Sequence, residues 1–229
     1  MHPPEASNQE LASLLHSLGF EVTLVTDPLR LAEVLIPPGD GSTGEVPPDL
    51  FVINACWFGM QAERYTEEQR ASFAVAADAH REAAIEEYIV GGGATLALHA
   101  AVTCFDTWPT WGELIGGAWA WGTSWHGEPE QIQWCPAQSE DWNNRDTWVR
   151  AVEPFSVTDE LYRECSLRPG TRVLACAESG EPLMWSPFDS DRVVVSLLGH
   201  DERSLSVRGH RSLLIAAIRH LTGHLVRPL

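Results

Sequence analysis

Three histidines and one glutamate stand at positions where the sequence could support proton-transfer chemistry. His99 directly follows the apolar run 94–98, and His200 follows a second apolar run and a glycine. In an open α/β sheet, ligands bind beyond the carboxyl ends of the strands. An imidazole changes charge near neutral pH, and a carboxylate can orient it or accept its proton. If these two imidazoles converge with His126 and Glu160, they form a site for acid–base chemistry or for ligand binding.

Each of the four candidates also has a purely structural explanation. A polar ring at the end of a buried strand must find a hydrogen-bond partner or lose about 1 to 3 kcal/mol, so His99 could be a satisfied core histidine. His126 could lie in a surface loop, and Glu160 could stabilise the first turn of a helix. His200 could belong to a turn that leads into a helix. The small residues at 100–101 leave space for a ligand beside His99.

A divalent metal ion is another use for the same side chains. Imidazole and carboxylate groups are common metal ligands, so a converging set of them could bind such an ion. No pair among the four has the helical spacing of an H-E-x-x-H motif. The sequence therefore predicts no cofactor, and a divalent metal at the histidine cluster is kept as an alternative.

Most of the ten tryptophans lie between residues 105 and 150. An indole can stack on the apolar face of a sugar ring while its N–H donates to a hydroxyl, although most tryptophans simply fill the core. Trp57 and Trp121 sit among small or polar neighbours and are the preferred stacking candidates. Trp108 and Asp201, which follows His200, complete the predicted substrate-binding residues.

The five cysteines offer a rival chemistry. They are odd in number and have no C-x-x-C spacing, which favours a reducing, cytoplasmic setting over a disulfide framework. A thiol nucleophile needs the turn between a strand and a helix, with a histidine in reach. That turn presents His99, Cys104 comes five residues later, and Cys56 is typical of a small buried residue. A cysteine hydrolase is therefore the weaker alternative.

The charge of the chain excludes several classes of function. The 229 residues include 32 acidic and 15 basic side chains, for a net charge of −17, and the sequence contains no lysine. An acidic surface repels phosphate backbones and anionic lipids, so we expect neither nucleic acid nor a membrane as a partner. The missing lysine excludes a P-loop and Schiff-base chemistry. Neither a signal peptide nor a membrane-spanning run is predicted.

The spacing of apolar residues predicts helices and short buried strands in alternation. A helix over 7–18 precedes a strand over 20–25, and the apolar run 49–55 is typical of a strand buried on both faces. A capping box opens a long helix over 66–90, which ends at a run of glycines. The next buried strand covers 94–99.

The second half of the chain adds strands over 171–177 and 192–198 and a closing helix over 207–221. Residues 105–150 lose this rhythm, and we expect them to form a Trp-rich insertion over one end of the sheet. Because strand, helix and strand alternate, the sequence predicts a doubly wound, mostly parallel sheet flanked by helices. No linker or internal repeat is visible, so a single α/β domain over 1–229 is expected.

Four segments that hold the candidate residues resemble the motifs of one known family. They are 91–101 (GGGATLALHAA), 108–117 (WPTWGELIGG), 157–162 (VTDELY) and 192–201 (RVVVSLLGHD). In this order they are similar to the central motifs of the ThuA-like (trehalose utilisation) family. The likeness covers nearly the whole chain.

The resemblance implies a fold related to the class I glutamine amidotransferases, without the catalytic cysteine at the strand-to-helix turn. It implies that the family's site residues correspond to His99, His126, Glu160 and His200. It also implies a small-molecule sugar, trehalose or a related derivative, at the carboxyl edge of the sheet, and functional pairing with a sugar oxidoreductase. A non-catalytic sugar-binding module is the main alternative. The oligomeric state is left open, and a homo-oligomer is among the alternatives.

Two features depart from the family pattern. Family members open with a strand that leads into a Gly-His turn, whereas residues 1–5 of this chain resemble the family segment that comes after that strand. The family's first strand is therefore expected to be missing, which would expose unpaired backbone at a strand edge. The stretch between Gly117 and His126 is also longer and richer in tryptophan than in the family.

Overall fold

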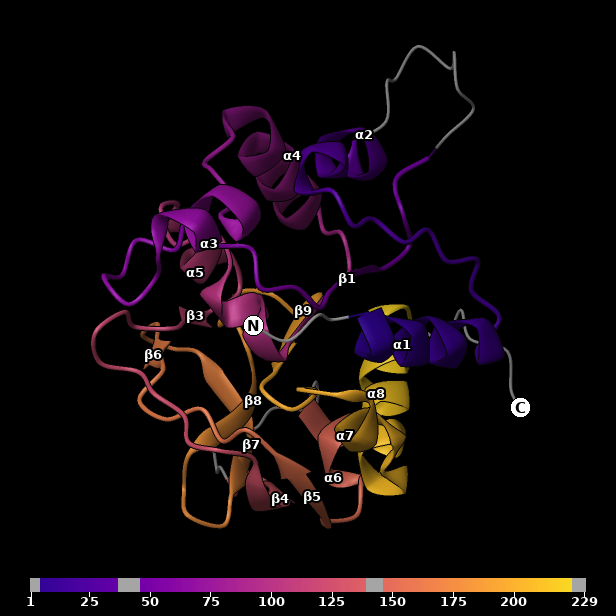
Figure 1. Cartoon of the computed structure of the whole chain (residues 1–229). Coiled ribbons are helices and arrows are strands. Elements are labelled where there is room, and N and C mark those ends of the chain that lie inside the picture. Colours follow the sequence, from indigo (N-terminus) through magenta and orange to yellow (C-terminus); the bar gives the residue numbers. More distant parts are fainter. Residues whose placement is uncertain (1–4, 37–45, 139–145, 224–229) are drawn as a thin grey trace.

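The computed structural model describes residues 5–36, 46–138 and 146–223. The first half of the described chain is mostly helical, the strands between residues 155 and 196 follow one another without a helix, and Figure 1 shows helices on both sides of a curled sheet. The elements are α1 (Glu5–Ser17), the 3-10 helix η1 (Pro28–Arg30), α2 (Leu31–Leu35), β1 (Phe51–Ile53), α3 (Glu67–Phe73), α4 (Ala79–Val90), β2 (Thr95–Leu98), the 3-10 helix η2 (His99–Thr103), α5 (Thr110–Leu114), β3 (Gly117–Ala118), β4 (Glu130–Pro136), α6 (Thr147–Arg150), β5 (Phe155–Asp159), β6 (Ser166–Leu167), β7 (Arg172–Ala177), β8 (Pro182–Ser186), β9 (Val193–Ser196), α7 (Glu202–Ser206) and α8 (Arg208–Leu221).

Among the described residues, seven strands form one sheet in the order β1-β2-β9-β8-β7-β4-β5. The neighbours β1, β2 and β9 run parallel, whereas β8, β7, β4 and β5 continue the sheet with antiparallel pairings. The predicted α/β fold is confirmed, and the sheet is mixed, with a larger antiparallel part than the strand–helix rhythm suggested. The parallel part carries the strand ends that the sequence singled out.

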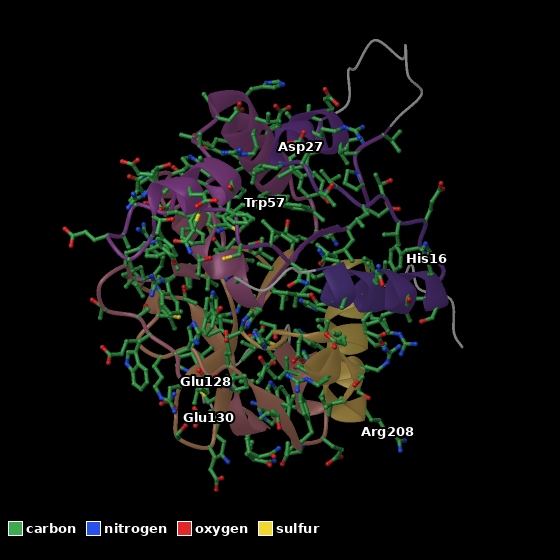
Figure 2. The ribbon with its side chains drawn as sticks, in the orientation of Figure 1. His16, Asp27, Trp57, Glu128, Glu130 and Arg208 are labelled. Atoms are coloured by element: carbon green, nitrogen blue, oxygen red, sulfur yellow. The ribbon has the colours of Figure 1, made fainter. Side chains whose placement is uncertain are left out.

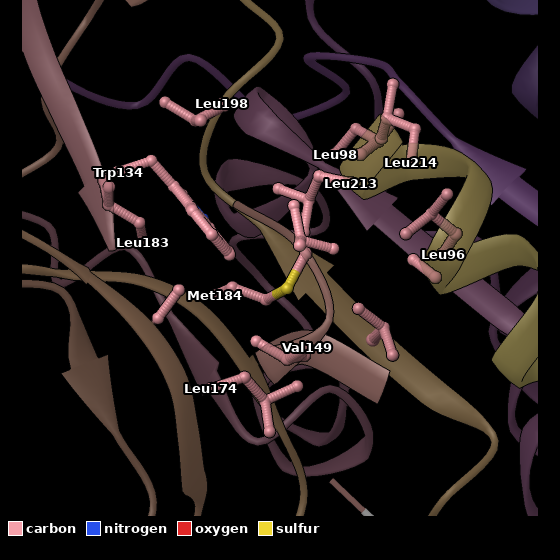
Figure 3. Close-up of a cluster of buried hydrophobic side chains, with 14 of the residues drawn as sticks. Leu96, Leu98, Trp134, Val149, Leu174, Leu183, Met184, Leu198, Leu213 and Leu214 are labelled. Carbon is pink, nitrogen blue, oxygen red and sulfur yellow. The ribbon is translucent and has the colours of Figure 1, made fainter. Parts of the chain in front are cut away.

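Two apolar clusters cover the two faces of the sheet. Leu96 and Leu98 of β2 pack in the cluster that includes α1 and α8, whereas Ala97 packs in the cluster that includes α2 and α4. Figure 3 shows the first cluster, in which Leu213 and Leu214 of α8 lie beside these leucines. Alternate residues of one short strand therefore enter opposite layers, as the period of a β-strand requires. This burial on both faces explains why β2 reads as a continuous apolar run.

The prediction of one long helix over 66–90 is wrong, because the chain forms two helices there. The capping box at Thr66 is present, but α3 ends at Phe73 and the next residue has extended backbone angles. A second N-cap at Asp78 then starts α4. The side chain of Phe73 is 54% exposed, so the first part of the predicted apolar stripe has no core to pack against. The break is explained by this missing support, since tertiary packing stabilises most protein helices.

The strand expected over 20–25 does not form either. Residues 20–26 follow α1 and form neither a strand nor a helix. Within the described residues, β1 pairs with β2 alone. A β-strand is stabilised through the hydrogen bonds and side chains of a neighbour, and here no neighbour pairs with this segment. Its apolar sequence is therefore not sufficient to make it a strand.

The Trp-rich stretch 105–150 has two parts. Residues 105–125 include α5 and β3, which pairs with β6 in a separate two-stranded sheet, whereas β4 joins the main sheet between β7 and β5. Only the first part matches the expected insertion. Residues 139–145 of this stretch lie outside the described residues. In the part of the chain that the structure describes, every helix is too short or too polar to cross a bilayer.

A pair of identical substitutions tests where the core lies. Leu174 of β7 is completely buried in the first cluster, whereas Leu29 of η1 is 62% exposed. We expect Leu174→Ala to lower the free energy of unfolding by about 2 to 5 kcal/mol, because it removes buried methyl groups and leaves a cavity. Leu29→Ala should change it by less than about 0.5 kcal/mol. Urea denaturation of both variants measures the difference, and equal losses would contradict this core assignment.

Candidate functional site

The backbone turns sharply where β2 ends. His99 follows Leu98 directly and has φ of +47°, a left-handed conformation that costs a residue with a side chain roughly 1 to 3 kcal/mol. The 3-10 helix η2 starts at this residue. The imidazole is buried, and its Nδ1 donates to the carbonyl of Leu197, which follows β9, over 2.9 Å. The strained backbone of His99 persists because β2, which precedes it, and its own imidazole ring are both buried and held in place.

Glu160 is the carboxylate on which the predicted histidines converge. It directly follows β5 and is buried. Its Oε2 lies 3.3 Å from Nε2 of His99 and 3.6 Å from Nδ1 of His126, and its Oε1 lies 3.4 Å from Nε2 of His200. The structure therefore brings all four predicted catalytic residues together, from the ends of β2, β5 and β9 and from the loop after β3. Their catalytic role stays a prediction.

Asp159 stabilises this arrangement by accepting backbone hydrogen bonds from the segments that carry Glu160 and His200. Its Oδ1 accepts the backbone N–H of Glu160 over 2.8 Å and that of His200 over 3.2 Å, and its Oδ2 accepts the N–H of Gly199 over 2.8 Å. The hydroxyl of Ser204 in α7 donates to the same Oδ2. One buried carboxylate therefore ties the turn after β9 to the end of β5. Sequence reasoning missed Asp159, although its place beside Glu160 was visible.

Tyr162 is a further residue of the site that sequence reasoning did not single out. Its hydroxyl lies 3.0 Å from Nε2 of His99, and its ring stacks on His126 with centroids 5.2 Å apart. In an extended segment, residues two apart share a face, so its spacing from Glu160 is the signal that could have found it. The phenol fixes two of the three imidazoles at once.

The pKa values of this group point to an ion pair between His99 and Glu160. Burial lowers the pKa of His99, but the hydrogen bond with Glu160 and the charge of Asp159 outweigh burial and raise it above its ordinary value. Burial raises the pKa of Glu160, but His99 and the charges of His126 and His200 outweigh it and lower it. Burial also raises the pKa of Tyr162 well above its ordinary value, so that the phenol is neutral, and its oxygen can accept from Nε2 of a charged His99.

The four residues line a cavity of about 270 Å³, here called the histidine pocket. Ligand pockets in proteins commonly measure roughly 300 to 1,000 Å³, so this volume suits a small molecule. The remaining wall carries aromatic and polar side chains from the loops after β1 and β3. These include Phe58, Tyr65, Arg64, Trp119 and Trp121. The ring of Trp121 packs against Phe58 with centroids 5.0 Å apart.

Of the predicted substrate-binding residues, only Trp121 lines the histidine pocket. Trp57 lines a different cavity, and Figure 2 shows it on the side of the molecule that α2 and α4 cover. Trp108 packs against Trp111 with ring centroids 6.5 Å apart. Asp201 caps α7 through the N–H of Ser204. Asp201 also lies 3.9 Å from Nδ1 of His200, although it does not line the pocket. The substrate-binding role of all four residues stays a prediction.

The cysteines near the pocket are poor nucleophiles. Cys104 is buried, its thiol donates to the carbonyl of Ala55 over 3.2 Å, and burial raises its pKa far above the ordinary value. Cys56 does line the histidine pocket, but burial raises its pKa as well, against a smaller lowering by the hydroxyl of Thr103. A reactive cysteine needs the opposite shift, toward the thiolate.

A metal ion requires several donor atoms arranged around one point. In the part of the chain that the structure describes, no three His, Cys, Asp or Glu side chains are placed to hold an ion together. The imidazoles of His99, His126 and His200 each face an oxygen of Glu160 across 3.3 to 3.6 Å.

Sequence comparison assigns the family. The ThuA family, described as trehalose utilisation, matches residues 70–221, which is more than half of the chain. The chain belongs to the ThuA family. The resemblance of its motifs to this family is therefore confirmed. No curated protein matches the chain.

Solved structures with ThuA-like folds resemble the chain over almost its whole length. A ThuA-like protein from Parabacteroides merdae has a TM-score of 0.69 and 19% identity, covering 100% of this chain and 88% of that one. A ThuA-like protein from Bacteroides uniformis has a TM-score of 0.67 and 16% identity, covering 96% and 87%. A cytoplasmic protein from Salmonella typhimurium has a TM-score of 0.55 and 13% identity, covering 96% and 87%. At these identities the likeness shows a shared fold.

The ion pair between His99 and Glu160 defines a pH window. The pKa of Glu160 lies below its ordinary 4.5, so its contribution to stability is lost as pH falls from that value through the folded pKa. The pKa of His99 lies above its ordinary 6.5, so its contribution is lost as pH rises from that value through the folded pKa. We expect the natural chain to exceed Glu160→Gln in free energy of unfolding most between pH 4.5 and 6.5.

Urea denaturation at several pH values measures this difference. The exposed Glu178 supplies the matched control, because Glu178→Gln removes the same charge from a side chain that does not line the histidine pocket. Its difference from the natural chain should show no maximum in the same window. A pH-independent difference for Glu160→Gln would contradict the ion pair.

Proposed function

We propose that this ThuA family protein binds a sugar or sugar derivative in the histidine pocket and acts on it by acid–base chemistry. The observation that carries the proposal is the convergence of three imidazoles on the buried carboxylate of Glu160 in a cavity of small-molecule size. The family's description, trehalose utilisation, supports a sugar as the ligand. Groups that change charge near neutral pH are suited to moving protons to and from hydroxyl groups.

The three imidazoles have different access to a ligand. Both ring nitrogens of His99 are engaged, by the carbonyl of Leu197 and by Glu160 with Tyr162. This ring therefore fixes the charge and position of Glu160. The side chain of His126 is 37% exposed, whereas that of His200 is almost buried. His126 is thus the proposed group that exchanges a proton with the ligand, and Glu160 lies 3.6 Å from its Nδ1.

The aromatic wall supports a ligand with apolar ring faces. Trp121 is partly exposed beside Phe58, and Trp119 packs edge-on against Tyr162 with centroids 5.0 Å apart. Sugar rings combine apolar C–H faces with hydroxyl groups at the rim, so an indole can stack on the face while polar groups bind the rim. In the proposal, Trp121 provides the stacking surface and the histidine cluster binds the hydroxyls.

The setting of the reaction is also proposed. A cytoplasmic location accords with the five free cysteines and with the description of the Salmonella typhimurium relative as cytoplasmic. A sugar oxidoreductase is the proposed functional partner, because redox chemistry on a sugar would supply or consume a ligand of this pocket. The cysteine-hydrolase alternative is not favoured, since burial raises the pKa of both Cys56 and Cys104.

A binding experiment with matched variants tests the proposal. Trehalose, maltose and glucose are titrated into the natural chain and followed by thermal shift and by calorimetry. We expect at least one of them to raise the melting temperature by a few degrees, because a ligand that binds only the folded state stabilises it. Trp121→Ala and His126→Ala should weaken that binding at least about tenfold, since each removes a wall of the pocket.

The control is Trp125→Ala. Trp125 is also exposed, but it packs under the guanidinium of Arg163 and does not line the histidine pocket. This variant should bind as the natural chain does. Product analysis after long incubation then separates an enzyme from a binding module. Failure of every saccharide to bind, or equal losses in all three variants, would overturn the proposal.

A further inference from the structure

Two cysteines that are far apart in the sequence lie opposite each other on neighbouring strands. The strands β4 and β7 are antiparallel neighbours in the sheet (Figure 1), and Cys135 of β4 is the direct partner of Cys176 of β7. Both thiols are free, and both side chains are partly buried. Neither residue lines the histidine pocket. The family description and the proposed function leave this pair without a role.

The register of the two strands sets the distance between the two cysteines. On one side of them the N–H of Ala137 donates to the carbonyl of Leu174 over 2.9 Å, and on the other the N–H of Glu178 donates to the carbonyl of Gln133 over 3.1 Å. Such bonds recur at every second pair of an antiparallel ladder, so the cysteines form the hydrogen-bonded pair between them. The Cα atoms of such a pair lie about 5.5 Å apart, within the roughly 4.4 to 6.8 Å that a disulfide spans.

The pair lies on the side of the sheet that faces water. Trp134 and Ala177, the next pair in the register, belong to the buried cluster on one face. Because successive residues of a strand point to opposite faces, Cys135 and Cys176 share the other face. Glu178, two residues after Cys176, is exposed. A small molecule in solution can therefore reach this pair of thiols.

A bond between the two sulfurs would be strained. Opposed residues of an antiparallel pair have Cβ atoms about 4.5 to 5.5 Å apart, whereas a disulfide needs about 3.5 to 4.5 Å. The register of β7 against β8 shifts at Ala175 and Cys176. Such an irregularity bends a strand locally and re-aims its side chains, which lets the two sulfurs approach. A strained disulfide is reduced more easily than a structural one.

The reduced form is stable at neutral pH. Burial raises the pKa of Cys176 above its ordinary 9.0, and the charges of Cys135 and Glu181 raise it further. The thiol of Cys176 is therefore protonated at pH 7, and it can lie opposite a second sulfur without charge repulsion.

We propose that Cys135 and Cys176 form a reversible oxidation site, at which a low-molecular-weight disulfide converts the two thiols into a cross-strand disulfide. One cysteine gives its proton to water, and its thiolate attacks a sulfur of the reagent. A mixed disulfide forms, and one half of the reagent leaves as a thiolate. The second cysteine also loses its proton and attacks the protein sulfur of the mixed disulfide, which releases the other half. Two protein thiols are oxidised, and one reagent disulfide is reduced to two thiols.

Cys56 and Cys104 are the competing pair. Cys104 is buried and its thiol donates to the carbonyl of Ala55 over 3.2 Å, so a reagent in water has poor access to it. Burial also raises the pKa of both thiols. The proposal therefore requires Cys135 and Cys176 to react while Cys56 and Cys104 stay reduced.

Glutathione disulfide is the probe, applied to the whole folded chain, and free thiols are then alkylated before digestion. Trypsin cuts this lysine-free chain after arginine alone, which leaves Cys104 and Cys135 on one peptide and Cys176 on another. We expect these two peptides to become linked, and fragmentation of the linked product in the mass spectrometer to place the bridge at Cys135. Excess reduced glutathione should remove the link without denaturant.

Single substitutions separate this pair from the other thiols. We expect Cys135→Ser and Cys176→Ser to abolish the link, whereas the matched control Cys56→Ser retains it. In Cys176→Ser, a glutathione adduct on Cys135 should persist at least about tenfold longer than in the natural chain, because no thiol lies opposite to displace it. Circular dichroism confirms that each variant is folded.

Several results would overturn the proposal. One is a folded natural chain in which Cys176 stays reduced, or becomes linked only in urea. Another is a bridge between Cys56 and Cys104 or between two copies of the chain in place of the expected one. A link that survives excess reduced glutathione would also contradict the proposed reversible site.

Discussion

The buried carboxylate of Glu160 is the constraint around which the site is organised. A carboxylate this far from water is stable only with positive charge and hydrogen bonds close by. Three imidazoles supply them, and the pKa of His99 is raised and that of Glu160 lowered as a consequence. In a chain with a net charge of −17, this cluster concentrates basic groups in one cavity.

The fold meets this constraint by bringing three strand ends together. Because β2 and β9 are adjacent and parallel, His99 and the turn before His200 leave the sheet at the same edge. Asp159, at the end of β5, ties that turn to Glu160 through backbone hydrogen bonds. The left-handed backbone of His99 is the strained element of this arrangement, and a fully buried strand holds it in place. Rigid packing therefore positions groups that the chemistry requires to be close together.

The sequence predicted the α/β class and the convergence of His99, His126, Glu160 and His200. Apolar strands that end in polar residues are a strong local pattern, and four segments of the chain resemble the motifs of the ThuA family. It did not predict the break before α4 or the loss of a strand at 20–25, since both depend on whether a tertiary partner is present. Asp159 and Tyr162 were missed because their roles arise from contacts across the sheet. The sequence also did not show that Trp57 and Trp108 lie outside the histidine pocket, because neighbours along the chain do not reveal which cavity a side chain enters.

The central claim is that Glu160 holds His99 in its charged form. A nitrogen-15 NMR titration of the imidazoles tests it directly, because the shifts of the two ring nitrogens report protonation and tautomer separately. The account predicts that His99 keeps protons on both nitrogens at pH 6.5 and loses one only at higher pH. It also predicts that Glu160→Gln moves this titration to lower pH. A His99 ring that is already neutral at pH 6.5 in the natural chain, or one whose titration Glu160→Gln leaves unchanged, would contradict it.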